Sequence, residues 1–225
     1  KMKPDNLTDR YTKRLILFFG GWGTRPEQFA GLQVGKETNR WISYDYTQPP
    51  QRPEGLAEEL MSYQEVHVVA WSLGVWAAEE AAQNFPFHFT SATAINGTSC
   101  PISNTLGIPE ATFQGTLEGL SPESLSRFNR RMCGSRDVLA RYDSLPARPF
   151  PELKDELAAL NMRIHQSKGQ QADNLWTQAI LCTDDRIFPI ENQRRFWQDR
   201  CPLTELKAPH YPFHLFNSWE ELWKR

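Results

Sequence analysis

Short apolar runs alternate along the chain with segments whose apolar residues follow a helical period. The runs of strand length are residues 14–20, 41–46, 66–71, 90–96, 176–183 and 202–208. The segments with a helical pattern are residues 53–63, 73–84, 190–200 and 213–225. Strands that alternate with helices are typical of a mainly parallel sheet covered by helices on both faces, so the pattern predicts an α/β fold.

The alternation is interrupted once, at about residues 100–174. This interval contains no convincing strand but has helical patterns around residues 121–133 and 151–166. The first pattern is preceded by Ser121, a residue type that often caps a helix. We therefore predict a single domain over residues 1–225, with a helical cap inserted between strands of the α/β core.

Composition narrows the classes of function. The 225 residues are 40% hydrophobic and 23% charged, with a formal net charge of −2, which gives no reason to expect nucleic acid or an acidic membrane surface as a partner. No apolar run approaches the roughly 18–20 residues of a membrane-spanning helix, and the polar segment 1–14 lacks the apolar centre of a signal peptide. The cysteines form no C-x-x-C pair, and no cluster has the spacing of metal ligands. We expect a cytoplasmic protein with free thiols, no metal and no cofactor.

The junction A-W-S-L-G at residues 70–74 carries the main chemical signal. Ser72 follows an apolar strand directly and precedes a helix, so it lies where a parallel sheet binds ligands. Small residues two positions away, Ala70 and Gly74, allow the strand and the helix to approach closely around a strained turn. The junction is therefore a variant of the G-x-S-x-G nucleophile elbow. The alternative is that Ser72 only caps the helix.

A nucleophilic serine needs an acid and a base, which follow it in this order in proteins of this type. The segment L-C-T-D-D-R-I-F-P ends the penultimate strand and offers Asp184 and Asp185, and we favour Asp185 because it precedes Pro189 by four residues. The segment K-A-P-H-Y-P-F-H follows the last strand and offers His210 and His214. We favour His210, since it comes directly after the strand, whereas His214 opens the expected terminal helix.

The serine also needs donors for the oxyanion that forms during attack. The backbone N–H of Leu73, the residue after the serine, is one candidate. The loop F-F-G-G-W-G after the first strong strand supplies the other, the backbone N–H of Trp22, whose indole is expected to line the pocket. Glycine pairs also make ordinary turns, but four features in the right order are much less common by chance than one.

Four motifs together resemble one known family. The segments LILFFGGWG, VAWSLGVWAAE, AINGTSCPI with GIPEATFQGTL, and APHYPFHLF are similar to those of BioG-type pimeloyl-[acyl-carrier protein] methyl ester esterases, from about Leu15 to the C-terminus. The resemblance implies an α/β-hydrolase fold, a triad of Ser72, Asp185 and His210, and an oxyanion hole from Trp22 and Leu73. It also implies hydrolysis of pimeloyl-[acyl-carrier protein] methyl ester to pimeloyl-[acyl-carrier protein] and methanol in biotin precursor synthesis.

The sequence departs from the common hydrolase pattern at two positions. Ala70 replaces the first glycine of the elbow, and Pro209 replaces the glycine that often precedes the histidine. Alanine is small enough for the elbow, whereas proline fixes the loop that carries the histidine. The segment AINGTSCPI is diagnostic of the resemblance, but its physical role does not follow from the sequence.

Arginines are concentrated in the expected cap. Six arginines and two acidic residues lie between positions 127 and 148. The candidates for contact with a partner are Arg127, Arg130, Arg131, Arg136 and Arg141. Guanidinium groups bind phosphates and carboxylates, and acyl-carrier proteins are acidic, so with the resemblance we expect this region to bind the carrier protein. The alternative is an ordinary solvated helix face.

Two other functions compete with the methyl esterase. A thioesterase or a broad short-chain carboxylesterase would keep the triad and change the substrate, although a small ester would not require the arginines. A binding protein on a hydrolase scaffold would need neither a serine, an acid nor a base, so the complete set of Ser72, Asp185 and His210 argues against it.

Overall fold

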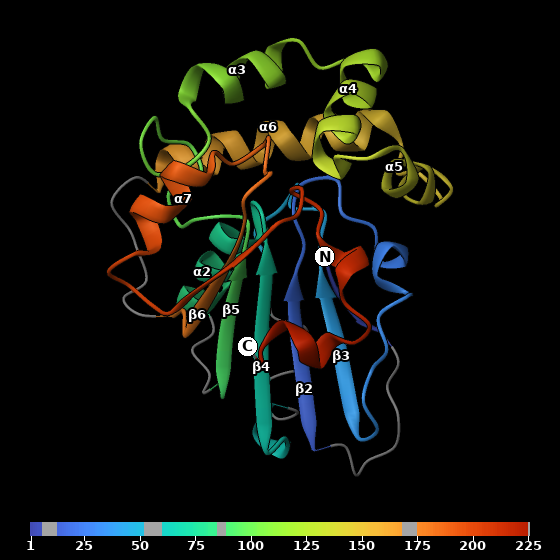
Figure 1. Cartoon of the computed structure of the whole chain (residues 1–225), viewed down its shortest axis with the longest axis vertical. Helices are drawn as coiled ribbons and strands as arrows, with labels where there is room; N and C mark the ends of the chain where they lie inside the picture. The colour runs from blue at the N-terminus through green and yellow to red at the C-terminus, as the bar shows by residue number, and fades with distance from the viewer. Residues whose placement is uncertain (6–12, 52–59, 85–88, 168–174, 225) are drawn as a thin grey trace.

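A 7-stranded sheet forms the centre of the protein. In the computed structural model, residues 1–5, 13–51, 60–84, 89–167 and 175–224 are described. The strands are β1 (Met2–Asp5), β2 (Arg14–Phe19), β3 (Thr38–Ser43), β4 (Glu65–Trp71), β5 (Ser91–Ile95), β6 (Gln178–Cys182) and β7 (Leu203–Leu206). Their order in space is β1-β3-β2-β4-β5-β6-β7, and every neighbouring pair is parallel except β1 with β3. The predicted mainly parallel sheet is confirmed (Figure 1).

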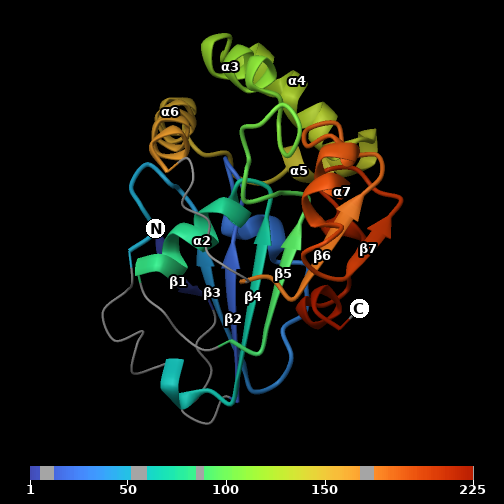
Figure 2. The ribbon, with the colours of Figure 1, turned by 90° about the vertical axis from the view of Figure 1, so that its left-hand side faces the viewer.

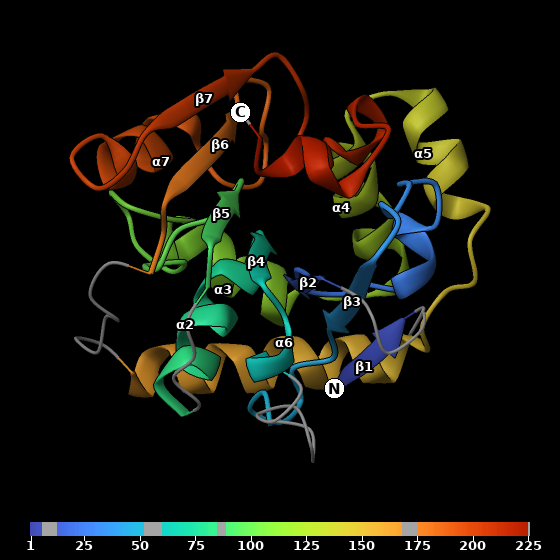
Figure 3. The same ribbon diagram turned by 90° about the horizontal axis from the view of Figure 1, so that it is seen from below.

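The central strands are buried along almost their whole length. In β2 every residue after Arg14 is buried, and in β4 every residue after Glu65. Such strands read as continuous apolar runs because helices cover both faces of a parallel sheet. Seen from below, the row of strands from β1 to β7 twists strongly, with α2 (Gly74–Asn84) and α7 (Ile190–Trp197) near different strands (Figure 3).

Four helices separate β5 from β6 in the chain. They are α3 (Glu110–Glu118), α4 (Pro122–Cys133), α5 (Arg136–Asp143) and α6 (Phe150–Gln166). They lie beyond the carboxyl ends of the strands, the edge where β4 ends in Trp71 (Figures 1 and 2). The expected helices at 121–133 and 151–166 are confirmed as α4 and α6, and Ser121 caps α4 through its side chain. Helices α3 and α5 were not predicted from the sequence.

The terminal segment 213–225 differs from the prediction. It forms two short 3₁₀ helices, Phe213–Leu215 and Trp219–Leu222, instead of one α-helix. Phe213, Phe216, Trp219 and Leu222 are all buried. These residues recur every three positions, which matches the 3.0 residues per turn of a 3₁₀ helix and not the 3.6 of an α-helix.

Three further elements differ from the prediction or lie mostly outside the described residues. The strand expected at 41–46 is β3 at Thr38–Ser43, shifted by three residues at both ends. The N-terminal β1, which was not predicted, pairs antiparallel with β3. Most of the helix expected at 53–63 lies outside the described residues.

The described helices give no sign of a membrane span or a metal centre. Among these residues no helix combines the length and apolar character needed to cross a bilayer. Within the same residues, no group of three His, Cys, Asp or Glu side chains is placed to hold a metal ion.

Candidate active site

Ser72 lies in a tight turn between the end of β4 and the start of α2. Its φ is 60°, in the left-handed region that residues other than glycine rarely adopt. A Cβ atom at position 74 would collide with the backbone carbonyl oxygens of Phe19 and Gly20. Gly74 is therefore required because the start of α2 comes close to the end of β2, whereas the sequence predicted a close approach to the strand that precedes Ser72.

The structure brings Ser72, His210 and Asp185 into one hydrogen-bonded chain. His210 Nε2 lies 2.9 Å from Ser72 Oγ, and His210 Nδ1 lies 2.8 Å from Asp185 Oδ2. The three residues are 6%, 1% and 8% exposed, in the order serine, histidine, aspartate. With the Nδ1 proton donated to Asp185, Nε2 can accept the serine proton, which is the arrangement that activates a serine for attack.

Asp185, and not Asp184, faces the histidine. Its Oδ1 accepts hydrogen bonds from the backbone N–H groups of Ile187 and Phe188, at 2.7 and 2.9 Å. Its Oδ2 accepts a further hydrogen bond from the side-chain amide of Gln193 at 3.1 Å. The Asp185 carboxylate is therefore held by the turn after β6 and by α7. Asp184, in contrast, is exposed.

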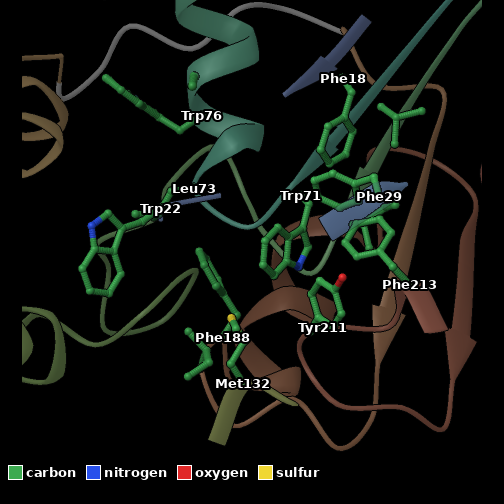
Figure 4. Close-up of a cluster of buried hydrophobic side chains, with 14 of the residues drawn as sticks. Phe18, Trp22, Phe29, Trp71, Leu73, Trp76, Met132, Phe188, Tyr211 and Phe213 are labelled. Atoms are coloured by element: carbon green, nitrogen blue, oxygen red, sulfur yellow. The ribbon is translucent and has the colours of Figure 1, made fainter. Parts of the chain in front are cut away.

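Burial also distinguishes the two candidate histidines. His210 is buried in the loop after β7, whereas His214 is exposed in the following 3₁₀ helix. The Trp71 indole N–H donates to the His210 carbonyl oxygen at 2.8 Å. The Trp71 ring also contacts Tyr211 and Phe213 edge-on, so an aromatic cluster fixes the histidine loop (Figure 4).

Asn96 is a residue of the site that sequence reasoning missed. It is fully buried with a φ of 46°. Its side-chain amide donates to the His210 carbonyl oxygen at 2.9 Å, and its Oδ1 accepts from the backbone N–H of Cys182 at 2.7 Å. Asn96 thus ties β5, β6 and the histidine loop together. The asparagine in AINGTSCPI was the available signal, because asparagine is enriched at positive φ.

The glycine that follows Asn96 has a separate role. A Cβ atom at Gly97 would collide with the Ser72 carbonyl oxygen. The Trp197 indole N–H donates to the Gly97 carbonyl oxygen at 3.0 Å. The segment AINGTSCPI therefore packs against the back of the serine turn and positions it.

We expect Asn96→Ala to destabilise the fold. The substitution leaves the buried N–H of Cys182 without its acceptor and the His210 carbonyl with one donor fewer. An unpaired buried polar group costs about 1–3 kcal/mol, so the free energy of unfolding should fall by at least this amount. Urea unfolding measures the change. The control is the exposed Asn217→Ala, expected within about 0.5 kcal/mol of the parent; equal effects of the two substitutions would contradict the role of Asn96.

The loop that carries Trp22 lies against the serine turn. A Cβ atom at Gly21 would collide with the Ser72 Cβ, so the loop and the serine are in close contact. The backbone N–H groups of Trp22 and Leu73 donate to no other protein atom among the described residues. Both residues line the cavity that contains Ser72 Oγ. The arrangement leaves two N–H groups available to an oxyanion.

Helix α6 anchors this loop from the other side. The Trp22 indole N–H donates to the Leu153 carbonyl oxygen at 2.7 Å, and the Gly23 N–H donates to Glu156 Oε2 at 3.3 Å. Glu156 is fully buried and pairs with Arg148 at 2.8 Å. Burial raises the pKa of Glu156, and the positive charge of Arg148 opposes this rise. Arg148, which contributed to the arginine excess in the sequence, therefore belongs to an internal ion pair.

A cavity of about 590 Å³, its open mouth included, lies over Ser72 and His210. Residues from the inserted helices and from the loops after β5 and β6 form most of its wall. Besides Trp22, Trp71 and Leu73, its apolar lining includes Ile108, Phe113, Phe128, Met132, Leu157 and Ile187. The exposed Arg131 and Arg186 also line it. An apolar cavity with few polar groups at a nucleophile suits an acyl chain with a reactive end.

The other predicted arginines lie outside this cavity. Arg127 and Arg130 are exposed on α4, and Arg136 and Arg141 are exposed on α5. Within the described part of the chain, none of these four arginines has a carboxylate oxygen within 4.0 Å. Their guanidinium groups therefore remain available to an external anion.

Comparison with known proteins places this site in a family. The family model for "Pimeloyl-ACP methyl esterase BioG" matches residues 2–222. The chain belongs to the BioG family. The match begins at residue 2, so it includes β1 and extends further than the resemblance from about Leu15. Family membership supports a hydrolase.

Two solved structures and one curated protein show what the chain is similar to. The crystal structure of BioG from Haemophilus influenzae has a TM-score of 0.89 and 38% identity and covers 100% of both chains. A Bacteroides fragilis protein named malonyl-[acyl-carrier protein] O-methyltransferase is 38% identical over 203 residues, which are 88% of this chain but 40% of that protein. A Mycobacterium tuberculosis protein, putative non-heme bromoperoxidase BpoC, matches with a TM-score of 0.62 at 14% identity over 96% of this chain and 90% of its own. The last likeness concerns the fold alone, and with the first it confirms the predicted α/β-hydrolase fold.

Proposed function

We propose that this chain hydrolyses the methyl ester of pimeloyl-[acyl-carrier protein] methyl ester, giving pimeloyl-[acyl-carrier protein] and methanol for biotin precursor synthesis. The observation that carries the proposal is the hydrogen-bonded chain of Ser72, His210 and Asp185 at an apolar cavity in a BioG family member. Under this proposal the protein works in the cytoplasm without a metal or a cofactor, and its partner is the acyl-carrier protein.

The reaction begins when Ser72 Oγ attacks the ester carbonyl carbon. His210 Nε2, 2.9 Å away, takes the serine proton, and Asp185 stabilises the resulting imidazolium through Nδ1–H. The carbonyl oxygen becomes an oxyanion, which accepts hydrogen bonds from the backbone N–H groups of Trp22 and Leu73. Both donors are fixed before substrate binds, since Leu73 lies in the elbow and Trp22 is anchored to α6.

The second half of the reaction releases both products. His210 gives its proton to the departing methoxide, so methanol leaves and an acyl-serine ester remains on Ser72. A water molecule then enters, loses a proton to His210 and attacks the acyl-serine carbonyl carbon. Collapse of this second intermediate returns the proton to Ser72 and releases the free carboxylate, while the thioester to the carrier is left intact.

We propose that α3, α4, α5 and α6 form a cap, within a single domain, that separates the active site from the carrier protein. Helix α4 gives this cap a positive face in a chain whose total charge is −2, since its exposed Arg127, Arg130 and Arg131 outnumber its one acidic residue, Glu123, whereas α5 carries two arginines and two aspartates. An acidic carrier protein would be attracted to that face, and complementary charges mainly raise the rate of association.

Charge reversal on the cap is expected to weaken binding of the carrier. Arg130→Glu and Arg136→Glu should each raise KM for the carrier-bound substrate about 3–10-fold, with an effect that shrinks as salt is added. Steady-state kinetics at two ionic strengths measures this. The matched control is Lys36→Glu, which makes the same charge change at an exposed position before β3. If all three variants share one KM, the cap arginines do not bind the carrier.

The function is tested by mass spectrometry of pimeloyl-[acyl-carrier protein] methyl ester after incubation with the protein. Loss of one methylene's mass, with the thioester intact, is the expected result. Release of the entire acyl chain would identify a thioesterase. Cleavage of a small ester alone would identify a short-chain carboxylesterase. If a reactive-serine probe also fails to label the protein, it is a binding protein on a hydrolase scaffold.

A further inference from the structure

Arg25 is a buried cation at the end of the loop that carries Trp22. It is 5% exposed, and no carboxylate oxygen lies within 4.0 Å of its guanidinium among the described residues. Its Nη1 donates to the carbonyl oxygens of Leu145 and Pro146, at 3.0 and 2.8 Å, and its Nη2 donates to that of Tyr142 at 3.0 Å. These carbonyls lie at and just after the C-terminal end of α5, where the negative end of the helix dipole favours a cation.

The Trp22 loop, residues 20–25, is attached to the inserted helices at three successive places. The Thr24 N–H donates to the Gly21 carbonyl oxygen at 3.2 Å, which closes a tight turn. Inside this turn, the Trp22 indole and the N–H of the glycine after it are bonded to α6. Arg25, next along the chain, is bonded to the end of α5. The place of the Trp22 backbone N–H therefore depends on how the cap lies on the core.

Arg25 also belongs to a closed ring of four residues. Its guanidinium carbon lies 4.4 Å from the centre of the Tyr142 ring, and the Tyr142 and Tyr211 rings meet edge-on with their centroids 5.7 Å apart. The Tyr211 hydroxyl donates to the Gln28 carbonyl oxygen at 2.9 Å, and the Gln28 side-chain oxygen accepts from the Arg25 backbone N–H at 3.2 Å. Tyr211 directly follows His210. The ring thus joins the Trp22 loop, the cap and the histidine loop.

We propose that the guanidinium of Arg25 is a positioning group for ester hydrolysis, which holds the Trp22 N–H where the oxyanion forms and the loop of His210 beside it. The inference rests on the proposed function, because it concerns the same reaction at Ser72. Arg25 is not a catalytic residue, since the described residues that line the cavity at Ser72 do not include it. It acts through the cap, and a displacement of about 1 Å in catalytic geometry can lower a rate about 100-fold.

The planar fork of arginine is essential to this arrangement. Two nitrogen atoms of one guanidinium donate to three carbonyl oxygens, while the face of the same group lies on the Tyr142 ring. A lysine ammonium keeps the charge but has neither a second nitrogen nor a planar face. Arg25→Lys should therefore keep a cation at the end of α5 and lose the geometry, so it separates the position of the loop from the presence of a charge.

A second buried arginine supplies the matched control. Arg163 of α6 is 9% exposed, donates to the Tyr46 carbonyl oxygen at 2.8 Å and lies over the Trp76 ring, 5.6 Å from its centre. It also holds the cap to the core, but in the part of the chain that the structure describes it makes no hydrogen bond to the Trp22 loop. A loss that comes from loosening the cap in general would appear at both arginines.

The test replaces each of the two arginines by lysine and by alanine. Thermal melting shows which variants are folded, and the lysine pair decides if an alanine variant is not. The values of kcat and KM are measured on dimethyl pimelate, a small ester that needs no carrier protein. Inhibition by an alkyl trifluoromethyl ketone is measured as well, because its adduct with a serine carries an oxyanion like that of the reaction intermediate.

The expected result is a loss of kcat at Arg25 alone. The value of kcat should fall about tenfold or more in Arg25→Ala and about threefold or more in Arg25→Lys, while KM changes less than about threefold and the affinity for the ketone falls with kcat. In both Arg163 variants kcat should stay within about twofold of the parent. Equal losses of kcat at the two positions, a parent-like kcat in Arg25→Lys, or an unchanged affinity for the ketone would each overturn the proposal. A parent protein that hydrolyses no ester would refute the proposed function, and this inference with it.

Discussion

Ser72→Ala is expected to abolish ester hydrolysis while leaving the protein folded. Removal of the nucleophile from a serine hydrolase triad lowers kcat by a factor on the order of 10⁶. The effect should be this large because no other hydroxyl or thiol is hydrogen-bonded to His210 Nε2 among the described residues. Mass spectrometry of the carrier-bound substrate and labelling by a reactive-serine probe both report the loss.

The conformation of the elbow provides a second readout for the same position. Ser72 has a φ of 60°, a conformation that costs an L-residue about 1–2 kcal/mol and glycine almost nothing. Ser72→Gly should therefore be inactive but more stable than Ser72→Ala by up to about 1 kcal/mol in urea unfolding. An active Ser72→Ala would contradict the role of the serine. A less stable Ser72→Gly would contradict the strain.

The α/β core could be predicted because its strands are buried on both faces. The apolar runs at 14–20 and 66–71 stand out for this reason, and they became β2 and β4. The terminal segment was assigned the wrong helix type, since its apolar spacing of three residues was read as an α-helical pattern. The helix α3 was missed because its burial is slight, with Phe113 as its one buried residue. Periodicity is weak where an element covers a cavity and not a core.

The candidate triad could be predicted because the order of strands in the sheet fixes where its members lie. A serine after β4, an acid after β6 and a histidine after β7 meet at one edge of the parallel sheet, whatever the loops between them contain. The supporting contacts could not be predicted in this way. Asn96 reaches His210 across 114 positions of sequence, and Glu156 reaches Gly23 across 133. Such pairs depend on side-chain packing between distant segments, which a single sequence does not display.

Asp185→Asn is expected to lower kcat about 10⁴-fold, a loss typical of this change in a serine hydrolase triad. The structure gives the reason. Asp185 Oδ1 accepts from two backbone N–H groups, those of Ile187 and Phe188, so the oxygen of an asparagine would take this place. Its NH₂ group would then face His210 Nδ1 and donate to it. The Nδ1 atom would have to accept, the ring proton would move to Nε2, and Nε2 could no longer accept the proton of Ser72.

The neighbouring aspartate supplies the matched control for this prediction. Asp184→Asn makes the same chemical change at an exposed side chain one residue away, and its kcat should stay within about twofold of the parent because the exposed carboxylate has no path to the histidine except through water. Steady-state kinetics on dimethyl pimelate compares the two variants without any contribution from the carrier protein. A larger loss in Asp184→Asn than in Asp185→Asn would mean that Asp184, and not Asp185, is the acid of the triad. A loss of less than tenfold in Asp185→Asn would mean that the hydrogen bond of 2.8 Å to His210 does not set the position of the ring proton.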